Sequence, residues 1–177
     1  AGGEGAPLAT LFHIRAFACR GVHVCVQNLG GIGNVTSLDW GRGGLRGLRV
    51  MAFDTGPGNM PLDGAVMRLT GGAQAMDWDG RWAAAGRVDE GLVGRWLRHP
   101  FLRKAPPKST GRELFGGVWL DRAWEQMDER GLGDADRLAT LTEWVGRSVA
   151  LNYRQHLPGR PGRVVVCGGG ARNPTLL

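Results

Sequence analysis

The chain has little cysteine and no long apolar run, and each shortage excludes a class of protein. Its three cysteines, Cys19, Cys25 and Cys167, show no CxxC spacing and cannot all pair with one another. This argues against a zinc site or a disulfide framework and favours reduced, buried thiols. There is also no signal-type segment and no run of about 18 apolar residues. We therefore expect a cytoplasmic protein that makes no membrane contact.

Lysine is scarce as well, because Lys104 and Lys108 are the only two among the 22 basic residues. The arginines that make up the rest are spread along the whole length rather than gathered into a basic block. Although the net charge is +6, such an even scatter is typical of solvated faces. We expect no nucleic-acid partner.

Glycine is abundant instead, with 31 residues in 177. Apolar runs and helical periodicity predict strands and helices that alternate along the chain after a glycine-rich opening loop at 1–7, which indicates the α/β class. Asn59 is expected to cap its helix and Pro100 to end another. The predicted strands are 22–26, 35–38, 49–53 and 164–166, and the predicted helices are 8–20, 59–69, 89–100, 114–130 and 138–153.

Three glycine-rich turns follow predicted strands, at 30–33, 56–58 and 168–170. Bare amides in such turns bind phosphate, because no side chain blocks the approach of a ligand. The first turn lacks the third glycine of a dinucleotide fingerprint, and the chain has no GxxxxGK[ST] motif, so the Rossmann and P-loop interpretations are both poor. Tight turns without any ligand stay an alternative for each of the three.

Asp54 is the carboxylate best placed for chemistry, since it ends a predicted strand beside Thr55 and Gly56, with room for a reacting molecule. The alternative is that it caps its own turn. Asp63, Asp77 and Asp79 are simpler to interpret as turn or cap residues. The four histidines share no ligand spacing and are expected to be structural or at the surface.

A polar loop at 106–113 brings together a lysine, two hydroxyls, an arginine and a glutamate. This combination suits either a polar ligand or an ordered network of ion pairs. The sequence leaves the choice between the two open.

Taken together, these segments resemble the signature blocks of the anhydro-N-acetylmuramic acid kinases, in the same order. Phe-Asp-Thr-Gly-Pro-Gly-Asn at 53–59 and Pro-Pro-Lys-Ser-Thr-Gly-Arg-Glu at 106–113 are long, unusual strings. The other matching blocks are 5–7, 26–36, 139–143 and 166–173. The resemblance covers essentially the whole chain.

The resemblance implies an incomplete lobe of the actin and hexokinase type, which is ribonuclease H-like, with a mixed sheet and flanking helices. Residues 1–177 would be one segment from the central to late part of a two-lobed sugar kinase, without the amino-terminal phosphate loop and the carboxyl-terminal end. The parent enzyme would use ATP and Mg²⁺ to open 1,6-anhydro-N-acetylmuramic acid hydrolytically and phosphorylate it, in cell-wall recycling. A homodimer is expected from the family, and this piece alone could be inactive.

Carried over residue by residue, the resemblance makes Asp54 the general base that activates the attacking water. It gives the nucleotide a set of turn residues: Asn28, Gly30, Gly31, Asn34, Gly168, Gly169, Gly170 and Asn173. It gives the sugar a second set: Asp54, Thr55, Gly56, Asn59 and Lys108. No metal ligand is assigned. The rival hypotheses are a non-catalytic nucleotide-binding module and another sugar kinase or ATPase of the same superfamily.

Overall fold

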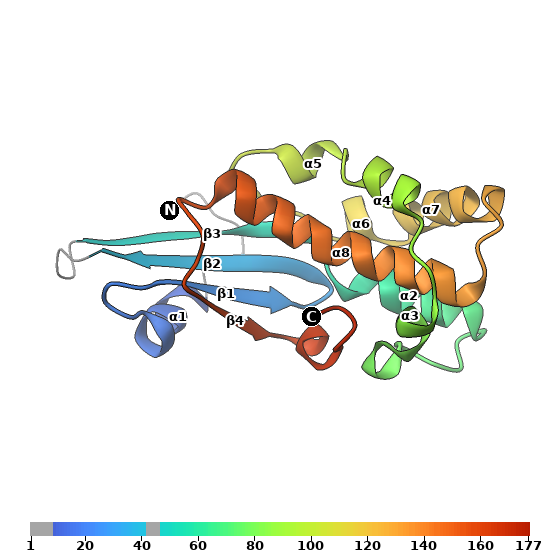
Figure 1. Cartoon of the computed structure of the whole chain (residues 1–177), viewed down its shortest axis with the longest axis horizontal. Helices are drawn as coiled ribbons and strands as arrows, with labels where there is room; N and C mark the ends of the chain where they lie inside the picture. The colour runs from blue at the N-terminus through green and yellow to red at the C-terminus, as the bar shows by residue number, and fades with distance from the viewer. Residues whose placement is uncertain (1–8, 42–46) are drawn as a thin grey trace.

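The computed structural model describes residues 9–41 and 47–177, and within them the chain forms a mixed sheet flanked by helices (Figure 1). The strand order is β3-β2-β1-β4, in which β1 and β4 are parallel and the other neighbours are antiparallel. The strands are β1 (His23–Leu29), β2 (Ile32–Trp40), β3 (Leu48–Pro57) and β4 (Arg163–Cys167). The α/β prediction is confirmed. The expected loop at 1–7 lies outside the described residues.

The predicted hairpin is confirmed, and both of its strands are longer than expected. Gly30 and Gly31 form the turn between β1 and β2. Gly33 was expected in the turn but lies inside β2, where the register with β3 shifts between Gly33 and Asn34. A Cβ on Gly33 would lie 2.7 Å from the Thr55 hydroxyl, so the close approach of the two strands at this position favours glycine.

The helices form a layer over one face of the sheet and a second body beyond the ends of the strands (Figure 1). The long helix α8 packs on one face against β3, while α1 covers part of the other. The helices are α1 (Thr10–Phe17), α2 (Asn59–Leu69), α3 (Arg81–Ala85), α4 (Glu90–Trp96), α5 (Pro100–Arg103), α6 (Arg112–Phe115), α7 (Gly117–Glu129) and α8 (Asp134–His156), with 3-10 turns η3 (Trp78–Gly80) and η4 (Gly169–Arg172).

Two predicted helix boundaries are wrong for local reasons. Pro100 begins α5 rather than ending the preceding helix, which suits proline at a first helical position, where no amide hydrogen is needed. The single helix expected over 114–130 is divided into α6 and α7 at Gly116. A Cβ at Gly116 would lie 2.3 Å from the Arg112 carbonyl, so the tight break requires glycine.

Each face of the sheet carries its own apolar cluster. Cys25, Val35 and Phe53 pack toward Tyr153 and Leu157 around the end of α8. A second cluster, built on Val24, Val26 and Leu38, is covered by α1 residues. The largest cluster joins α2 to α8 and centres on Trp144, which stacks on Trp119 with ring centroids 4.0 Å apart. One face of the sheet is thus packed against the end of α8 and the other against α1.

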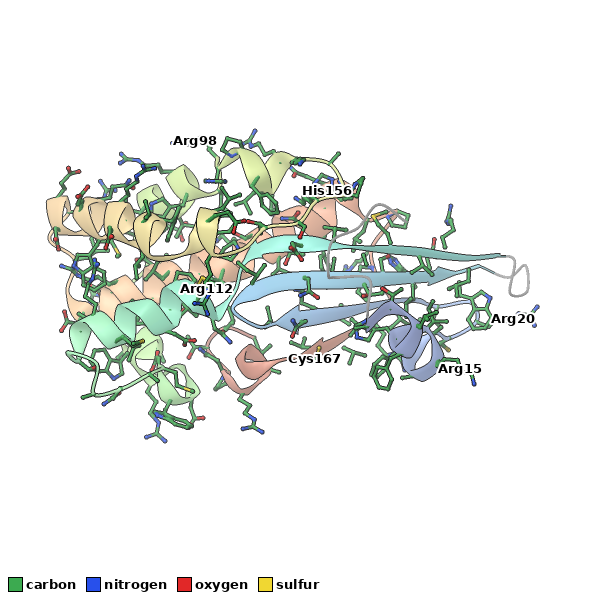
Figure 2. All side chains as sticks on the ribbon, turned by 180° about the vertical axis from the view of Figure 1, so that it is seen from behind. Arg15, Arg20, Arg98, Arg112, His156 and Cys167 are labelled. Atoms are coloured by element: carbon green, nitrogen blue, oxygen red, sulfur yellow. The ribbon has the colours of Figure 1, made fainter. Side chains whose placement is uncertain are left out.

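The three cysteines are free, as expected, but only Cys25 is buried, and Cys19 is exposed. Several arginines form surface ion pairs, such as Arg130 with Asp89 and Arg147 with Glu90. The arginines labelled in Figure 2 extend from separate parts of the molecule. None of the helices in the two described ranges is both long and apolar enough to cross a membrane.

Candidate functional site

Three polar side chains form a row across the sheet near the carboxyl ends of β1 and β3. The register pairs Asn28 of β1 with Asn34 of β2, and Asn34 with Asp54 of β3. Directly paired residues on antiparallel strands place their side chains on the same face. On the other side of β1, Asn28 is in register with Cys167, the last residue of β4 before the glycine turn. The sheet thus brings Asp54 and the expected nucleotide residues to one edge.

Asp54 is held by the polar loop that runs alongside β3. Its amide donates to the Lys108 carbonyl (3.2 Å). Its carboxylate atom Oδ2 accepts hydrogen bonds from the Thr110 amide (2.8 Å) and the Ser109 hydroxyl (3.1 Å). Within residues 9–41 and 47–177, no group donates to Oδ1. The alternative that Asp54 caps its own turn is therefore wrong, because its partners lie more than fifty residues away.

The electrostatic environment of Asp54 combines opposing effects. Burial raises the pKa of the carboxyl above its ordinary value, while the Thr110 amide, the Ser109 hydroxyl and the charge of Lys108 lower it. The charge of Glu113 raises it again. The net direction of the pKa of Asp54 is upward, because burial is the largest of these effects.

The space expected beside Asp54 is filled by packed residues. Thr55 is completely buried, and its hydroxyl accepts a hydrogen bond from Gln27 at 3.2 Å. A Cβ on Gly56 would lie 2.6 Å from the Leu102 side chain. Asp54 itself is only 6% exposed. The loop at 106–111 covers the carboxylate through Ser109 and Thr110, and Ser109 is exposed.

Lys108 lies beneath this loop rather than at its surface. Its side chain is buried, and the ammonium donates to the carbonyls of Phe101 (3.1 Å) and Leu102 (3.4 Å) in α5. The same ammonium lies 4.9 Å from the centre of the Phe101 ring and 5.8 Å from that of Phe53. The long polar string in the sequence therefore contributes one buried cation as well as surface groups.

The two glycine turns meet at the start of α2. The Gly30 carbonyl accepts from the amide of Asn59, and the Gly31 carbonyl accepts from those of Gly58 and Met60. These carbonyls take the place of a side-chain cap, and Asn59, predicted to be that cap, is the first helical residue instead. Its side-chain amide donates to the Leu29 carbonyl (3.1 Å).

The Asn59 side chain also faces the turn after β4. A Cβ on Gly169 or Gly170 would lie 3.3 and 3.0 Å, respectively, from its amide atoms. Gly168 has φ of +84°, and a Cβ there would lie 2.5 Å from Oδ1 of Asn28. The structure therefore groups Asn59 with the expected nucleotide residues, although the sequence placed it with the sugar.

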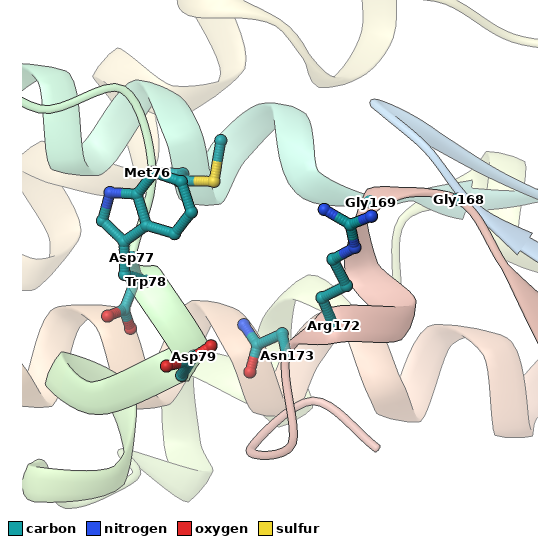
Figure 3. Close-up of a pocket in the computed structure, with 8 residues that line it drawn as sticks. All are labelled: Met76, Asp77, Trp78, Asp79, Gly168, Gly169, Arg172 and Asn173. Atoms are coloured by element: carbon teal, nitrogen blue, oxygen red, sulfur yellow. The ribbon is translucent and has the colours of Figure 1, made fainter.

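A cavity of about 380 Å³ opens beside the glycine turn (Figure 3). Gly168, Gly169 and Asn173, three of the residues predicted to hold the nucleotide, line it. Across the cavity lie Met76, Asp77, Trp78 and Asp79 from the segment before α3, and Arg172 completes the wall. The sequence analysis singles out neither Met76 nor Trp78, which belong to no matching block. Arg172 lies within the block at 166–173, but no role was predicted for it.

The other aspartates considered as catalytic candidates, Asp63, Asp77 and Asp79, lie away from Asp54 in the chain and have local structural settings. Asp77 accepts from the amides of Trp82 and Ala83, as a helix cap does, which confirms the simpler interpretation. Asp79 has a left-handed backbone with φ of 56°. Asp63 lies inside α2, and burial raises its pKa to about 6. In the part of the chain that the structure describes, no group of three or more His, Cys, Asp or Glu side chains could hold a metal ion.

The mixed sheet with flanking helices forms an α/β lobe, which agrees with the sugar-kinase class to which the family match assigns the chain. The family model described as "Anhydro-N-acetylmuramic acid kinase" matches residues 1–177, and the chain belongs to this family. It is 46% identical over 179 residues to the protein of that name from Synechocystis sp. and 49% identical over 177 residues to the one from Cyanothece sp.. The alignments cover 98% and 99% of this chain but 45% and 47% of those relatives. The chain thus spans about half the length of the curated relatives it matches.

Proposed function

We propose that the full-length protein is an ATP-dependent kinase that opens the anhydro bridge of 1,6-anhydro-N-acetylmuramic acid with water and transfers a phosphoryl group to the freed hydroxyl. The observation that carries the proposal is the row from Asp54 through Asn34 to Asn28. It brings a carboxylate with a raised pKa and the glycine turns to one edge of one sheet.

In this proposal Asp54 is the general base. Its Oδ2 is occupied by Ser109 and Thr110, so Oδ1 takes the proton of the water that attacks the anomeric carbon. The bond from that carbon to the bridging oxygen breaks, as in an inverting glycosidase. The oxygen released at C6 then attacks the γ-phosphoryl group, where positioning and neutralisation of charge supply most of the catalysis.

We place ATP along the turns at 30–31 and 168–170, with the adenosine part in the cavity lined by Trp78, Gly169 and Arg172. The bare glycine amides suit phosphate oxygens, and the apolar face of an indole suits a purine ring. Mg²⁺ would accompany the phosphates. No described cluster of side chains offers it a ready site, so the ion takes no step in this account.

The residues expected to hold the sugar divide into two groups. Thr55 and Gly56 are packed, and we propose that they shape the wall of the sugar site rather than bind hydroxyl groups. Asn59 contacts the nucleotide turns, and we assign it to holding α2, β1 and the last turn together. The place of the enzyme in cell-wall recycling, its cytoplasmic location and a homodimeric state belong to the same proposal.

The test is to incubate the full-length protein with ATP, Mg²⁺ and the anhydro sugar and to measure the product by mass spectrometry. We expect N-acetylmuramic acid 6-phosphate and ADP in equal amounts. Binding of ATP without any sugar phosphate would favour the rival hypothesis of a non-catalytic nucleotide-binding module. Phosphorylation of other hexoses, with the anhydro sugar left untouched, would favour another sugar kinase of the superfamily.

A further inference from the structure

The buried cation beneath the polar loop has a place that a ligand-binding lysine would not have. Lys108 is 5% exposed, and its ammonium is directed to the carbonyls of α5 rather than to the surface of the loop. Burial lowers its pKa to about 8, and the opposing charge of Asp54 raises it. At neutral pH the group thus keeps most of its charge, although it is enclosed.

Lys108 is connected to Asp54 through both charge and backbone. Its carbonyl accepts the Asp54 amide, and the next two residues donate to Oδ2 of Asp54. Since the ammonium anchors the loop to α5, it fixes the position of both donors. Its charge also favours the ionised form of Asp54, against the burial that favours the neutral form.

We propose that Lys108 is a positioning residue, which anchors the 106–111 loop to α5 and thereby holds Asp54 ionised, with Oδ2 bound and Oδ1 left for the reacting water. This inference rests on the proposed function. The proposal differs from the expectation that Lys108 binds the sugar, because here the lysine affects the reaction only by positioning Asp54.

Other charged groups near the pair are few. Among the described residues, Glu113 opposes the ionisation of Asp54, and Lys104 opposes that of Lys108. His156 packs its ring against Phe53 and has its pKa lowered by burial and by the charge of Lys108. At Asp54 itself, the effects that favour the ionised carboxyl are the Thr110 amide, then the Ser109 hydroxyl, then the charge of Lys108.

The test compares the full-length protein with its Lys108→Met variant over a range of pH. Loss of the ammonium removes a cation that favours the carboxylate, so the pKa of Asp54 increases further. We expect the acid limb of kcat/KM to move up by about one pH unit, with kcat about tenfold lower below that limb. The KM for the sugar should change by less than about threefold.

Lys104→Met is the matched control, because Lys104 is the other lysine of the chain and is exposed on the same segment. It should leave the acid limb of kcat/KM in place. A Lys108→Met variant whose sugar KM increases tenfold or more, while its acid limb stays where it was, would show that the lysine binds the sugar and would overturn the proposal.

Ser109→Ala supplies a second variant in case the loss of a buried cation prevents folding. Ser109 is exposed, so its removal spares the core, and it deletes one donor to Oδ2. Carboxyl NMR of Asp54 in this variant should report a higher pKa than in the parent, and it does so without any assay of activity. If the pKa of the Asp54 carboxyl is unchanged in Ser109→Ala, the loop does not hold Asp54 as proposed. If the unmodified protein has no kinase activity, only the proposed function is contradicted.

Discussion

The two halves of the functional edge are built in different ways. At the end of β3, Asp54 is covered and held by side-chain and backbone donors from a distant loop, above a buried lysine. At the end of β4 a glycine turn lines a cavity, and after β1 the residues Gly30 and Gly31 present their carbonyls to α2. In the half at β3 the carboxylate is covered, and charged and polar groups set its ionisation. In the other half a cavity lies open beside glycines, which carry no side chains to fill it.

This difference teaches where each kind of substitution should act. Changes of charge near β3 should alter the rate of the chemical step with little effect on nucleotide affinity. Added atoms at the β4 turn should do the reverse, because they fill space that a ligand needs. In the sheet register, Asn34 and Asn28 lie between the two halves.

The largest effect is expected from Asp54→Asn. An amide of the same shape cannot take a proton from water, so turnover should fall by about a hundredfold to ten thousandfold, while the Kd for ATP stays within about twofold. Steady-state kinetics and calorimetry measure the two quantities. Asp63→Asn serves as the matched control, since Asp63 is another partly buried carboxylate and should keep its turnover. A near-normal rate for Asp54→Asn would exclude Asp54 as the base.

On the open half, Gly169→Val should weaken ATP binding by about tenfold or more. The branched side chain would extend into the cavity that Gly169 lines and would crowd the Asn59 amide, 3.3 Å from the first added atom. Calorimetry with ATP provides the measurement. Gly94→Val is the control, because nothing lies within 4 Å of a Cβ at Gly94. Equal ATP affinities for the two variants would exclude the turn at 168–170 as part of the nucleotide site.

A smaller effect is expected from Trp78→Ala on the opposite wall. Trp78 is 63% exposed, and its indole forms a face of the cavity (Figure 3). Stacking of a base on an aromatic ring contributes about 1–3 kcal/mol, so ATP affinity should fall by about tenfold. Phe12→Ala, which removes an exposed aromatic ring from α1, should have no such effect. If both variants bind ATP alike, the purine lies elsewhere.

The smallest effect concerns stability and compares Asp54 with Asp63, a carboxylate to which no residue in the described ranges donates a hydrogen bond. Burial raises the pKa of Asp63 to about 6, from an ordinary value near 3.8. The pKa of Asp63 is higher in the folded protein than in the unfolded chain. The contribution of its neutral carboxyl to the free energy of unfolding is therefore complete below about pH 4 and is lost as the pH rises through about 6. Asp63→Asn should therefore add about 1–2 kcal/mol to the free energy of unfolding at pH 8 and much less at pH 4. Chemical denaturation at both values of pH tests this, and a gain of equal size at both would contradict the ionisation argument.

The sequence predicted the strands and the glycine turns because both follow from local patterns of apolar residues and glycine. It could not show that Ser109 and Thr110 hold Asp54, since their contacts join residues more than fifty positions apart. The same limit applies to Trp78 and Arg172, which share a cavity only after folding. Asn59 was predicted as a cap from its type, but the carbonyls of Gly30 and Gly31 take that role. Tertiary contacts decided each of these cases.

The most direct test of the account is a crystal structure of the full-length protein with a non-hydrolysable ATP analogue and the anhydro sugar. We predict adenosine in the cavity between Trp78 and Gly169, and a water held between Oδ1 of Asp54 and the anomeric carbon. A sugar bound away from Asp54, with its carboxylate still closed off behind Ser109 and Thr110, would contradict the central claim.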